Sequence, residues 1–271
     1  MKIWYGENQT QDVRLLLRAS EVLFSGRSKY QRIDIIENKT YGRVMFIDGT
    51  FQLTERDEHI YHEMLAHIPL LSIQNPENIL IIGGGDGGLA RECLKHNVKK
   101  IKLVEIDEMV VDLSRKYLPS LSSSFNDRRL DVIIDDGARF VKETDEKFDA
   151  VLVDSTDPVG PASALFTEEF YSDVKKILKE NGIIGSQTGS PFLYPDHLKN
   201  AYFNLKKVFK YIEVYVATVP TYPSAIWSFT FASDSYIRRI RDPNFKTYYY
   251  NAKIHDSRAL PQFVMEMLNA Q

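Results

Sequence analysis

Apolar and polar positions change their spacing near residue 78 of this 271-residue chain. Before that point, residues 30–36, 41–47 and 50–54 alternate in part and are separated by polar turns, which is typical of antiparallel strands. After it, short continuous apolar runs take turns with segments of helical periodicity. The chain is therefore expected to begin with a small antiparallel β unit and to continue as an α/β unit.

A helix is expected between the two patterns, over residues 58–71. Its apolar side chains recur at helical spacing and fall on one face, namely Ile60, Met64, Leu65, Ile68 and Leu71. Pro69 is expected to lie in its last turn or to kink it. We expect a β domain over residues 1–58 and a catalytic domain over residues 59–271, with residues 74–77 leading into the larger sheet.

The second part of the chain predicts a doubly wound sheet. Strands are expected at residues 78–82, 101–105, 130–134, 148–153 and 183–187, and helices at residues 89–96, 107–116, 168–180 and 195–209. Asn181-Gly182 is expected to end the helix before it. Residues 214–218 and 228–232 are expected to form a final antiparallel pair. The fold class is therefore α/β, with a Rossmann-like, mostly parallel sheet of the methyltransferase type covered on both faces.

The first of these strands runs into a glycine-rich turn. Residues 83–88 are Gly-Gly-Gly-Asp-Gly-Gly, and glycines let a backbone turn tightly and approach a ligand closely. Strand, glycine loop and helix in this order are typical of the nucleotide-binding start of a doubly wound sheet. Asp86 is the informative residue, because a carboxylate there would repel a phosphate or an amino-acid carboxylate. It suits a ligand that is cationic at that point.

Acidic side chains follow the first four parallel strands, at the end of the sheet where such folds bind ligands. They are Asp86, Glu105 with Asp107, Asp135 with Asp136, and Asp154 with Asp157. Glu105 stands where an acid binds the paired hydroxyls of a ribose, and Asp136 is placed to accept from an adenine amino group. The remaining acids exceed what a nucleoside needs, so they indicate a cationic partner: an amine, a sulfonium or a metal ion.

Composition narrows the class of protein. The net charge of -3 argues against a general nucleic-acid binder, and no apolar run reaches membrane-spanning length. Residues 1–11 lack the apolar core of a secretory signal. The single cysteine, Cys93, excludes an internal disulfide and fits a reducing compartment. We therefore expect a cytoplasmic enzyme with no nucleic-acid or membrane partner.

The histidines on the expected helix raise the question of a metal site. His62-Glu63 and His67 come close to the H-E-x-x-H zinc pattern, but the second histidine is one residue too far. Five residues turn a helix by roughly 140°, so His62 and His67 are expected to face different ways. A metal site on this helix is therefore not expected, whereas a metal at the strand ends stays open.

Three segments together resemble the spermidine synthases, the polyamine aminopropyltransferases. They are residues 83–88, residues 154–161 (Asp-Ser-Thr-Asp-Pro-Val-Gly-Pro) and residues 220–224 (Pro-Thr-Tyr-Pro-Ser). Tyr30-Gln31 and the segments 54–58 and 61–64 are similar to that family as well, so the resemblance covers nearly the whole chain. It implies transfer of an aminopropyl group from decarboxylated S-adenosylmethionine to a diamine such as putrescine, giving spermidine and 5′-methylthioadenosine.

The resemblance also implies roles for individual residues. The nucleoside would be bound by Gln31, Glu105, Asp136, Gly137 and Pro161. The aminopropyl group and the amine would be bound by Gln52, Tyr61, His62, Asp86, Asp154, Asp157 and Tyr222. Asp154 matches the family's proton acceptor, and residues 156–166 match its mobile gatekeeper loop. The resemblance implies no metal, no cofactor besides the nucleoside co-substrate, and a homodimer or homotetramer.

The chain departs from the family pattern at two positions beside the expected amine pocket. Gly189 stands where an acidic residue is frequent, and Ala225 stands where glycine is usual. The acceptor amine therefore stays open, with agmatine and cadaverine as alternatives to putrescine. An amine N-methyltransferase on the same fold, an NAD enzyme and a non-catalytic polyamine-binding protein are the other interpretations that these residues allow.

Overall fold

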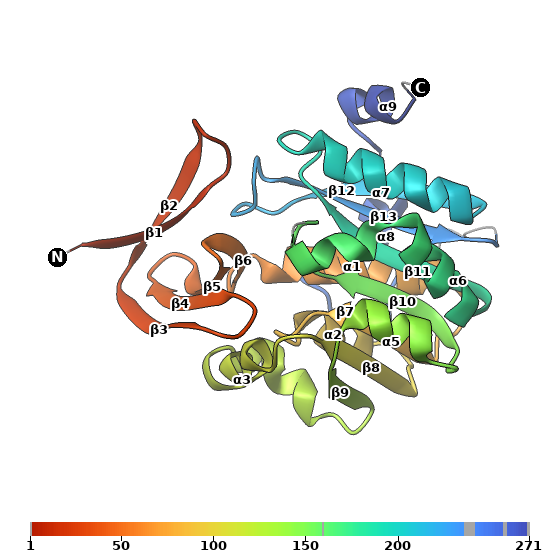
Figure 1. Cartoon of the computed structure of the whole chain (residues 1–271), viewed down its shortest axis with the longest axis horizontal. Coiled ribbons are helices and arrows are strands. Elements are labelled where there is room, and N and C mark those ends of the chain that lie inside the picture. Colours follow the sequence, from red (N-terminus) through yellow and green to blue (C-terminus); the bar gives the residue numbers. More distant parts are fainter. Residues whose placement is uncertain (1, 159, 236–241, 257–258, 270–271) are drawn as a thin grey trace.

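The computed structural model describes residues 2–158, 160–235, 242–256 and 259–269 of the chain. Its larger sheet has seven strands in the order β12–β13–β11–β10–β7–β8–β9 (Figure 1). These strands are β7 Asn78–Gly83, β8 Lys100–Glu105, β9 Leu130–Ile134, β10 Phe148–Asp154, β11 Leu178–Gly189, β12 Tyr211–Thr218 and β13 Ile226–Ser233. Five neighbouring strands pair in parallel, in the order β11, β10, β7, β8 and β9. Strand β13 is antiparallel to both of its neighbours. The predicted fold class and the final antiparallel pair are thus confirmed.

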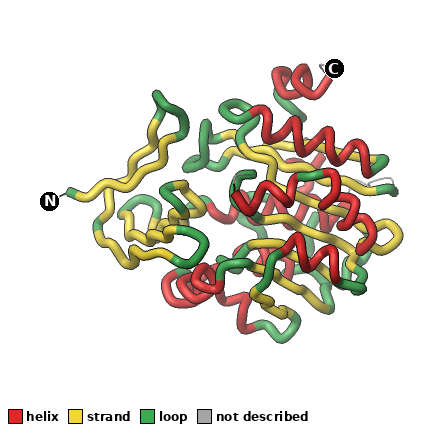
Figure 2. Tube along the Cα trace, in the orientation of Figure 1, coloured by secondary structure: helices red, strands yellow, loops and turns green. Residues whose placement is uncertain are grey.

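Helices cover both faces of this sheet, and Figure 2 shows the strands enclosed between them. The helices in contact with it are α1 Glu58–Ser72 and α2 Gly88–Leu94 on one face, and α5 Gly137–Glu143, α6 Glu168–Ile177 and α7 Pro195–Val208 on the other. Successive side chains of a strand point to opposite faces. Ile79 and Ile81 accordingly pack with α1 and α2, while Leu80 and Ile82 pack with α5 and α6. Burial on both faces explains why β7 is a continuous apolar run.

The N-terminal residues form two smaller sheets. The four-stranded antiparallel sheet consists of β3 Glu21–Arg27, β4 Arg32–Asn38, β5 Gly42–Ile47 and β6 Thr50–Thr54. Ahead of it, β1 Ile3–Asn8 and β2 Arg14–Ala19 form a hairpin that extends away from the α/β unit, at the left of Figure 1. Ile33 and Met45 pack against α3 Glu108–Tyr117 and α4 Pro119–Ser122. The four-stranded sheet is therefore held against the larger unit by an apolar core of its own.

Several predicted boundaries differ from the structure by a few residues, and two of the differences have a clear physical reason. The strand expected over 30–36 is β4, which begins at Arg32. The helix expected over 168–180 is α6, which ends at Ile177, and the residues after it begin β11. Leu178 pairs with Phe148 of β10, and the left-handed conformation of Asn181 (φ +66°) falls at a shift of register in the same strand. Asn181-Gly182 thus lies at an irregularity within β11 and does not mark the end of α6.

Helix α1 follows its prediction closely, with Pro69 in its last turn. The C-terminal segment packs back on this helix. The carboxylate of Glu63 accepts hydrogen bonds from the backbone N–H groups of Tyr248, Tyr249 and Tyr250, at 2.6, 2.8 and 2.7 Å. Two short helices, α8 Ala252–Asp256 and α9 Gln262–Asn269, follow. In the described ranges, no helix combines the length and the apolar character that crossing a membrane requires.

Candidate active site

A cavity of about 550 Å³ lies between the four-stranded sheet and the carboxyl ends of β7, β8 and β10. It brings together nearly all the predicted site residues, namely Gln31, Gln52, Tyr61, His62, Asp86, Glu105, Asp136, Gly137, Asp154, Asp157 and Tyr222. Pro161 belongs to the 3-10 helix η2 Gly160–Phe166, but its side chain lies outside the described part of the chain. Ligand binding beyond the carboxyl ends of parallel strands is the rule for this class of sheet.

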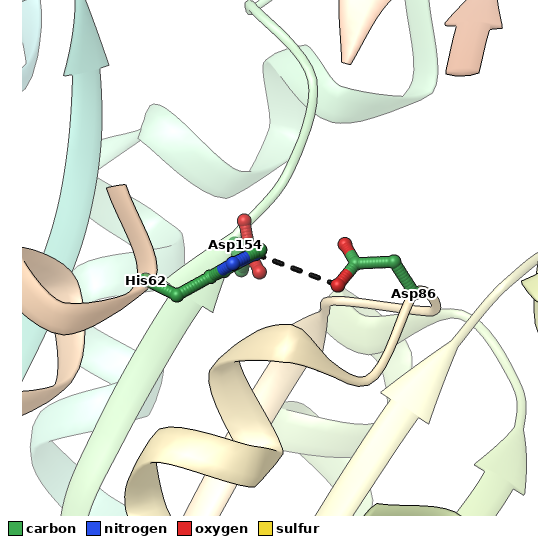
Figure 3. A group of neighbouring side chains, drawn as sticks. All are labelled: His62, Asp86 and Asp154. Carbon is green, nitrogen blue, oxygen red and sulfur yellow. Dashed lines mark ion pairs between the residues drawn. The ribbon is translucent and has the colours of Figure 1, made fainter. Parts of the chain in front are cut away.

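The glycine loop brings three elements into contact at the centre of the cavity. Gly83 has φ +81°, and a Cβ there would lie 2.0 Å from the backbone oxygen of Asp154. A Cβ on Gly88 would lie 2.3 Å from the ring of His62. Only glycine permits these approaches, so β7, β10 and α1 converge. Figure 3 shows the result, with His62, Asp86 and Asp154 side by side.

Asp154 ends β10 and has one carboxylate oxygen free. Its Oδ1 accepts a hydrogen bond from the Tyr61 hydroxyl at 2.7 Å, whereas its Oδ2 is buried and has no partner among the described residues. Burial and, to a smaller extent, the charge of Asp86 raise the pKa of Asp154 to about 6. His62 and the hydrogen bond from Tyr61 have the opposite effect on this pKa. The group is therefore a carboxylate near neutral pH with an affinity for protons well above that of an exposed aspartate.

His62 joins two carboxylates. Its Nδ1 lies 2.6 Å from Glu58 Oε2 and its Nε2 lies 3.4 Å from Asp86 Oδ1. Burial lowers the pKa of His62, but Asp86 and Glu58 outweigh it and leave that pKa well above its usual value. For Asp86 burial raises the pKa, and His62 outweighs it in the opposite sense, so the net pKa is lowered. The pair is thus an imidazolium beside an ionised carboxylate.

Two further residues hold His62, and sequence reasoning missed both. The guanidinium of Arg91 donates from Nη1 and Nη2 to the two oxygens of Glu58, both at 2.9 Å. Glu58 is 7% exposed, so the ion pair is largely shielded from water. The spacing of four between Glu58 and His62 on a helix was a usable signal for their contact. No sequence pattern pointed to Arg91.

The side of the cavity that is predicted to bind a nucleoside is built around Glu105. Its carboxylate accepts from the backbone N–H groups of Gly85 at 3.2 Å and Asp107 at 2.9 Å. Burial raises the pKa of Glu105 to about 7 in spite of these hydrogen bonds. Asp107 does not line the cavity but accepts from the amide of Gln31 at 2.9 Å, which fixes that side chain.

Asp135 and Asp136, which follow β9, have different environments. Asp136 lines the cavity and caps α5, where its Oδ1 accepts from the N–H groups of Ala138 at 2.8 Å and Arg139 at 3.0 Å. Asp135 forms an ion pair with Arg139 and is not among the cavity-lining residues. Of the predicted ring of strand-end acids, Asp107 and Asp135 therefore support the site from outside it.

Aromatic rings line the amine side. The rings of Tyr61 and Tyr222 lie 5.7 Å apart, and Trp227 meets Tyr222 edge-on at 4.6 Å. Tyr222 donates its hydroxyl hydrogen to the backbone oxygen of Gln52, which ties the α/β unit to β6. Asp157 Oδ1 is buried without a partner among the described residues, and burial raises the pKa of this carboxyl. Carboxylates among aromatic faces are a suitable surface for an organic ammonium.

Glu7 of the hairpin is another group that the sequence did not reveal. It accepts from the backbone N–H of Phe51 at 3.0 Å and is 5% exposed. Burial raises the pKa of Glu7 to about 7, and the charge of Asp157 adds to the effect. The N-terminal hairpin thus brings an acid close enough to Asp157 for the two charges to interact, although Glu7 does not itself line the cavity.

A metal ion is the alternative occupant of the central cluster. One ligand atom from each of His62, Asp86 and Asp154 lies within 4.8 Å of the others. Both ring nitrogens of His62 already face carboxylates, Nδ1 that of Glu58 and Nε2 that of Asp86, so the ring presents no free nitrogen to a metal ion. His67 faces elsewhere, as predicted, and contacts His96 at 3.0 Å and Glu92 at 3.1 Å. The donor set therefore fits an organic cation better than a metal ion.

The fold and the cavity define a class: an α/β enzyme of the methyltransferase-like type with an acidic ligand cavity. Residues 58–241 match the spermine/spermidine synthase domain, and residues 3–55 match the spermidine synthase tetramerisation domain. The polyamine aminopropyltransferase of Thermoplasma volcanium is 48% identical over 98% of this chain and 97% of its own length. That of Thermoanaerobacter pseudethanolicus is 43% identical over 99% of both.

Solved structures agree with these relatives. A spermidine synthase in complex with the transition-state analogue AdoDATO has a TM-score of 0.95 and 43% identity, over 99% of this chain and 96% of that one. The spermidine synthase from Thermotoga maritima has a TM-score of 0.92 and 41% identity, over 99% and 95%. The chain therefore belongs to the spermine/spermidine synthase family, the polyamine aminopropyltransferases.

Proposed function

We propose that this enzyme transfers the aminopropyl group of decarboxylated S-adenosylmethionine to putrescine, giving spermidine and 5′-methylthioadenosine. One observation carries the proposal: Asp86, inside the glycine loop, and Asp154 both line the cavity, with carboxylate oxygens within 4.8 Å of each other. Two carboxylates at that separation attract a cation strongly. The donor offers a primary ammonium on its aminopropyl arm and lacks the methionine carboxylate that Asp86 would repel.

The reaction needs a base. An alkyl amine has a pKa near that of lysine, so its neutral, nucleophilic form costs roughly 4 to 5 kcal/mol at pH 7. The nitrogen lone pair attacks the carbon beside the sulfonium, the carbon–sulfur bond breaks, and its electron pair leaves with sulfur as a neutral thioether. The proton released by nitrogen goes to Asp154, whose Oδ2 is free to accept it. Alignment of nitrogen, carbon and sulfur by the cavity supplies the rest of the acceleration.

Each remaining side chain has a task in this scheme. On the nucleoside side, Glu105 binds the ribose hydroxyls, and Gln31, Asp136, Gly137 and Pro161 contact the rest of the nucleoside. Tyr61 orients Asp154, and His62 keeps Asp86 ionised for the donor ammonium. Gln52, Tyr222 and Asp157 hold the acceptor amine. No metal or further cofactor takes part.

The proposed activity is tested by release of 5′-methylthioadenosine from decarboxylated S-adenosylmethionine with putrescine, cadaverine, 1,3-diaminopropane, agmatine and spermidine. Fast release with putrescine, unchanged by a metal chelator, is the expected result. Faster release with agmatine or cadaverine would move the proposal to that acceptor. Methylation of an amine by intact S-adenosylmethionine, without release of 5′-methylthioadenosine from the decarboxylated donor, would replace it by N-methyl transfer.

We also propose that the enzyme is a homotetramer. The match of residues 3–55 to the spermidine synthase tetramerisation domain supports this. The hairpin of β1 and β2 within that range exposes Ile3, Trp4 and Leu16 by 47, 54 and 43%. Exposed apolar side chains clustered on one projecting element are typical of an interface with another subunit.

A further inference from the structure

Two buried polar atoms beside the amine side of the cavity have no hydrogen-bond partner among the described residues. They are Asp157 Oδ1 and His197 Nδ1. Both border one small space next to Gly189, because a Cβ built on Gly189 would lie 3.7 Å from the first and 3.3 Å from the second. A carbon there would be in ordinary contact with Asp157 Oδ1 but closer than usual to His197 Nδ1. Since buried polar atoms are almost always paired, this space is suited to a hydrogen-bond donor.

The surrounding structure holds this space open. Gly189 has φ +79°, a conformation that side chains other than glycine rarely adopt. Its N–H donates to Gln187 Oε1 at 2.9 Å, and the Gln187 amide donates in turn to the backbone oxygen of Ser155 at 3.0 Å. This bond ties β11 to the segment that carries Asp157. Gln187 and Asp157 line the cavity, so the space adjoins it.

His197 is fixed from the other side. It lies in the first turn of α7, and its ring stacks on Tyr194 with centroids 5.4 Å apart and planes 26° from parallel. A neutral imidazole protonated on Nε2 accepts through Nδ1. With His197 in this tautomer, Asp157 and His197 offer two acceptors and no donor to the same space. A ligand that fills it must supply at least two N–H groups.

We propose that Asp157 and His197 together bind the non-reacting ammonium of the acceptor amine, and that His197 is a specificity-determining residue for acceptors with a second amine. The inference rests on the proposed function. An ammonium has three donors and no acceptor, which matches the two unpaired atoms. An acceptor without this second amine leaves both atoms unpaired on binding and is discriminated against for that reason.

The test compares putrescine with n-butylamine, which has the same carbon chain and lacks the second amine. For H197F, which keeps a ring on Tyr194 and removes the acceptor, kcat/KM for putrescine should fall at least about 10-fold, mainly through KM. The same parameter for n-butylamine should change less than about twofold. H197N, whose amide oxygen stands near the position of Nδ1, should recover part of the putrescine activity.

His59 provides the matched control. Its ring contacts Tyr248 with centroids 3.8 Å apart, and its Nε2 is likewise buried without a partner among the described residues, but it does not line the cavity. H59F should leave the ratio of the two amines unchanged. An equal loss on both amines in H197F would overturn the inference and give His197 a packing role.

A wild-type enzyme that turns over no amine would instead contradict the proposed function. Calorimetry of putrescine binding to the complex with 5′-methylthioadenosine then tests the inference separately. Binding about 10-fold weaker in H197F than in wild type supports it, and equal binding overturns it.

Discussion

The two carboxylate oxygens of Asp154 have different environments. Its Oδ1 is held by Tyr61 and its Oδ2 is free, so the group is positioned and still able to accept a proton. Asp154→Asn keeps the shape and removes the base. Turnover should fall at least about a hundredfold, the usual contribution of a general base. The affinity for 5′-methylthioadenosine, measured by calorimetry, should stay within a few-fold of wild type.

Asp135 provides the control for this variant. It also follows a parallel strand, but it pairs with Arg139 and does not line the cavity. Asp135→Asn keeps the oxygen that accepts from the N–H of Asp136 and should retain most of the turnover. Near-normal turnover in Asp154→Asn would remove this residue from the role of base.

The pKa of Asp154 leads to a prediction about pH. A base must be ionised to act, and burial with the charge of Asp86 puts the pKa of Asp154 at about 6. In the profile of kcat/KM against pH, activity should therefore rise through about pH 6 and not through the range of an exposed aspartate. Asp86→Asn removes a negative charge that raises this pKa, so the acid limb should move to lower pH. A limb that stays in place, or moves upward, would contradict the coupling.

At the scale of elements, the buried parts of the fold were predictable and the half-exposed parts were not. Residues 78–82 are apolar on both faces of the sheet, and such a run has few alternative interpretations. Strands β1 to β3 leave many side chains exposed or half-buried, so their alternation is weak. The extension of β11 back to Leu178 depends on pairing with Phe148, a contact that local sequence does not report.

The residues of the candidate site also fall into a predictable and an unpredictable group. The rule that ligands bind at the carboxyl ends of parallel strands was enough to bring Asp86, Glu105 and Asp154 together. Arg91 and His197 reach the site from helices, and their roles follow only from tertiary contacts. Glu7 comes from a hairpin that the sequence did not predict. The rule therefore identified residues at the strand ends and missed residues that helices and the N-terminal hairpin bring close to the cavity.

Glu7 gives the hairpin a pH-dependent stability. Burial raises its pKa in the folded protein to about 7 from the usual 4.5. Between these values the unfolded chain is ionised at this residue and the folded protein is not, so stability falls as pH rises and the full effect is present above pH 7. Glu7→Gln removes a penalty of at most about 3 kcal/mol. Its melting temperature should exceed that of wild type at pH 8 and approach it at pH 5, and an equal difference at both pH values would contradict this account.

The 3-10 helix η2 covers the cavity from the side of β10. Gly160, Ala162 and Leu165 of this element line the cavity, and Gly160 has φ +59° with no atom within 4 Å of a Cβ position. A segment with such loose packing at one end is expected to respond to ligand. Hydrogen exchange in residues 160–166 should slow several-fold when 5′-methylthioadenosine binds, while exchange in α6 stays constant. Unchanged exchange in η2 would remove its role as a gate.

At the scale of the whole molecule, the cavity depends on contacts between parts that are far apart in sequence. Gln52 comes from the four-stranded sheet, Asp86 from the glycine loop, and Tyr222 from the turn between β12 and β13. The hydrogen bond from Tyr222 to the backbone oxygen of Gln52 connects the α/β unit directly to the four-stranded sheet. The boundary expected at residue 58 stays a prediction, and the active site lies across it. The proposed reaction therefore requires both units in their observed relation.

The outer face of the hairpin leads to a prediction about assembly. Pairing of β1 with β2 sets Trp4 opposite Arg18 and Gly6 opposite Leu16, so Trp4 and Leu16 share a face, while Leu17 packs inward. Two charges on the outer face should oppose subunit contact without disturbing the inner core. Wild type should have the mass of a tetramer by light scattering, and the double variant Trp4→Glu, Leu16→Glu should have a smaller one. The same change at Phe192, which is 64% exposed and outside residues 3–55, should leave the tetramer intact. A tetramer that survives both changes would assign assembly to another surface, and a monomeric wild type would end the proposal.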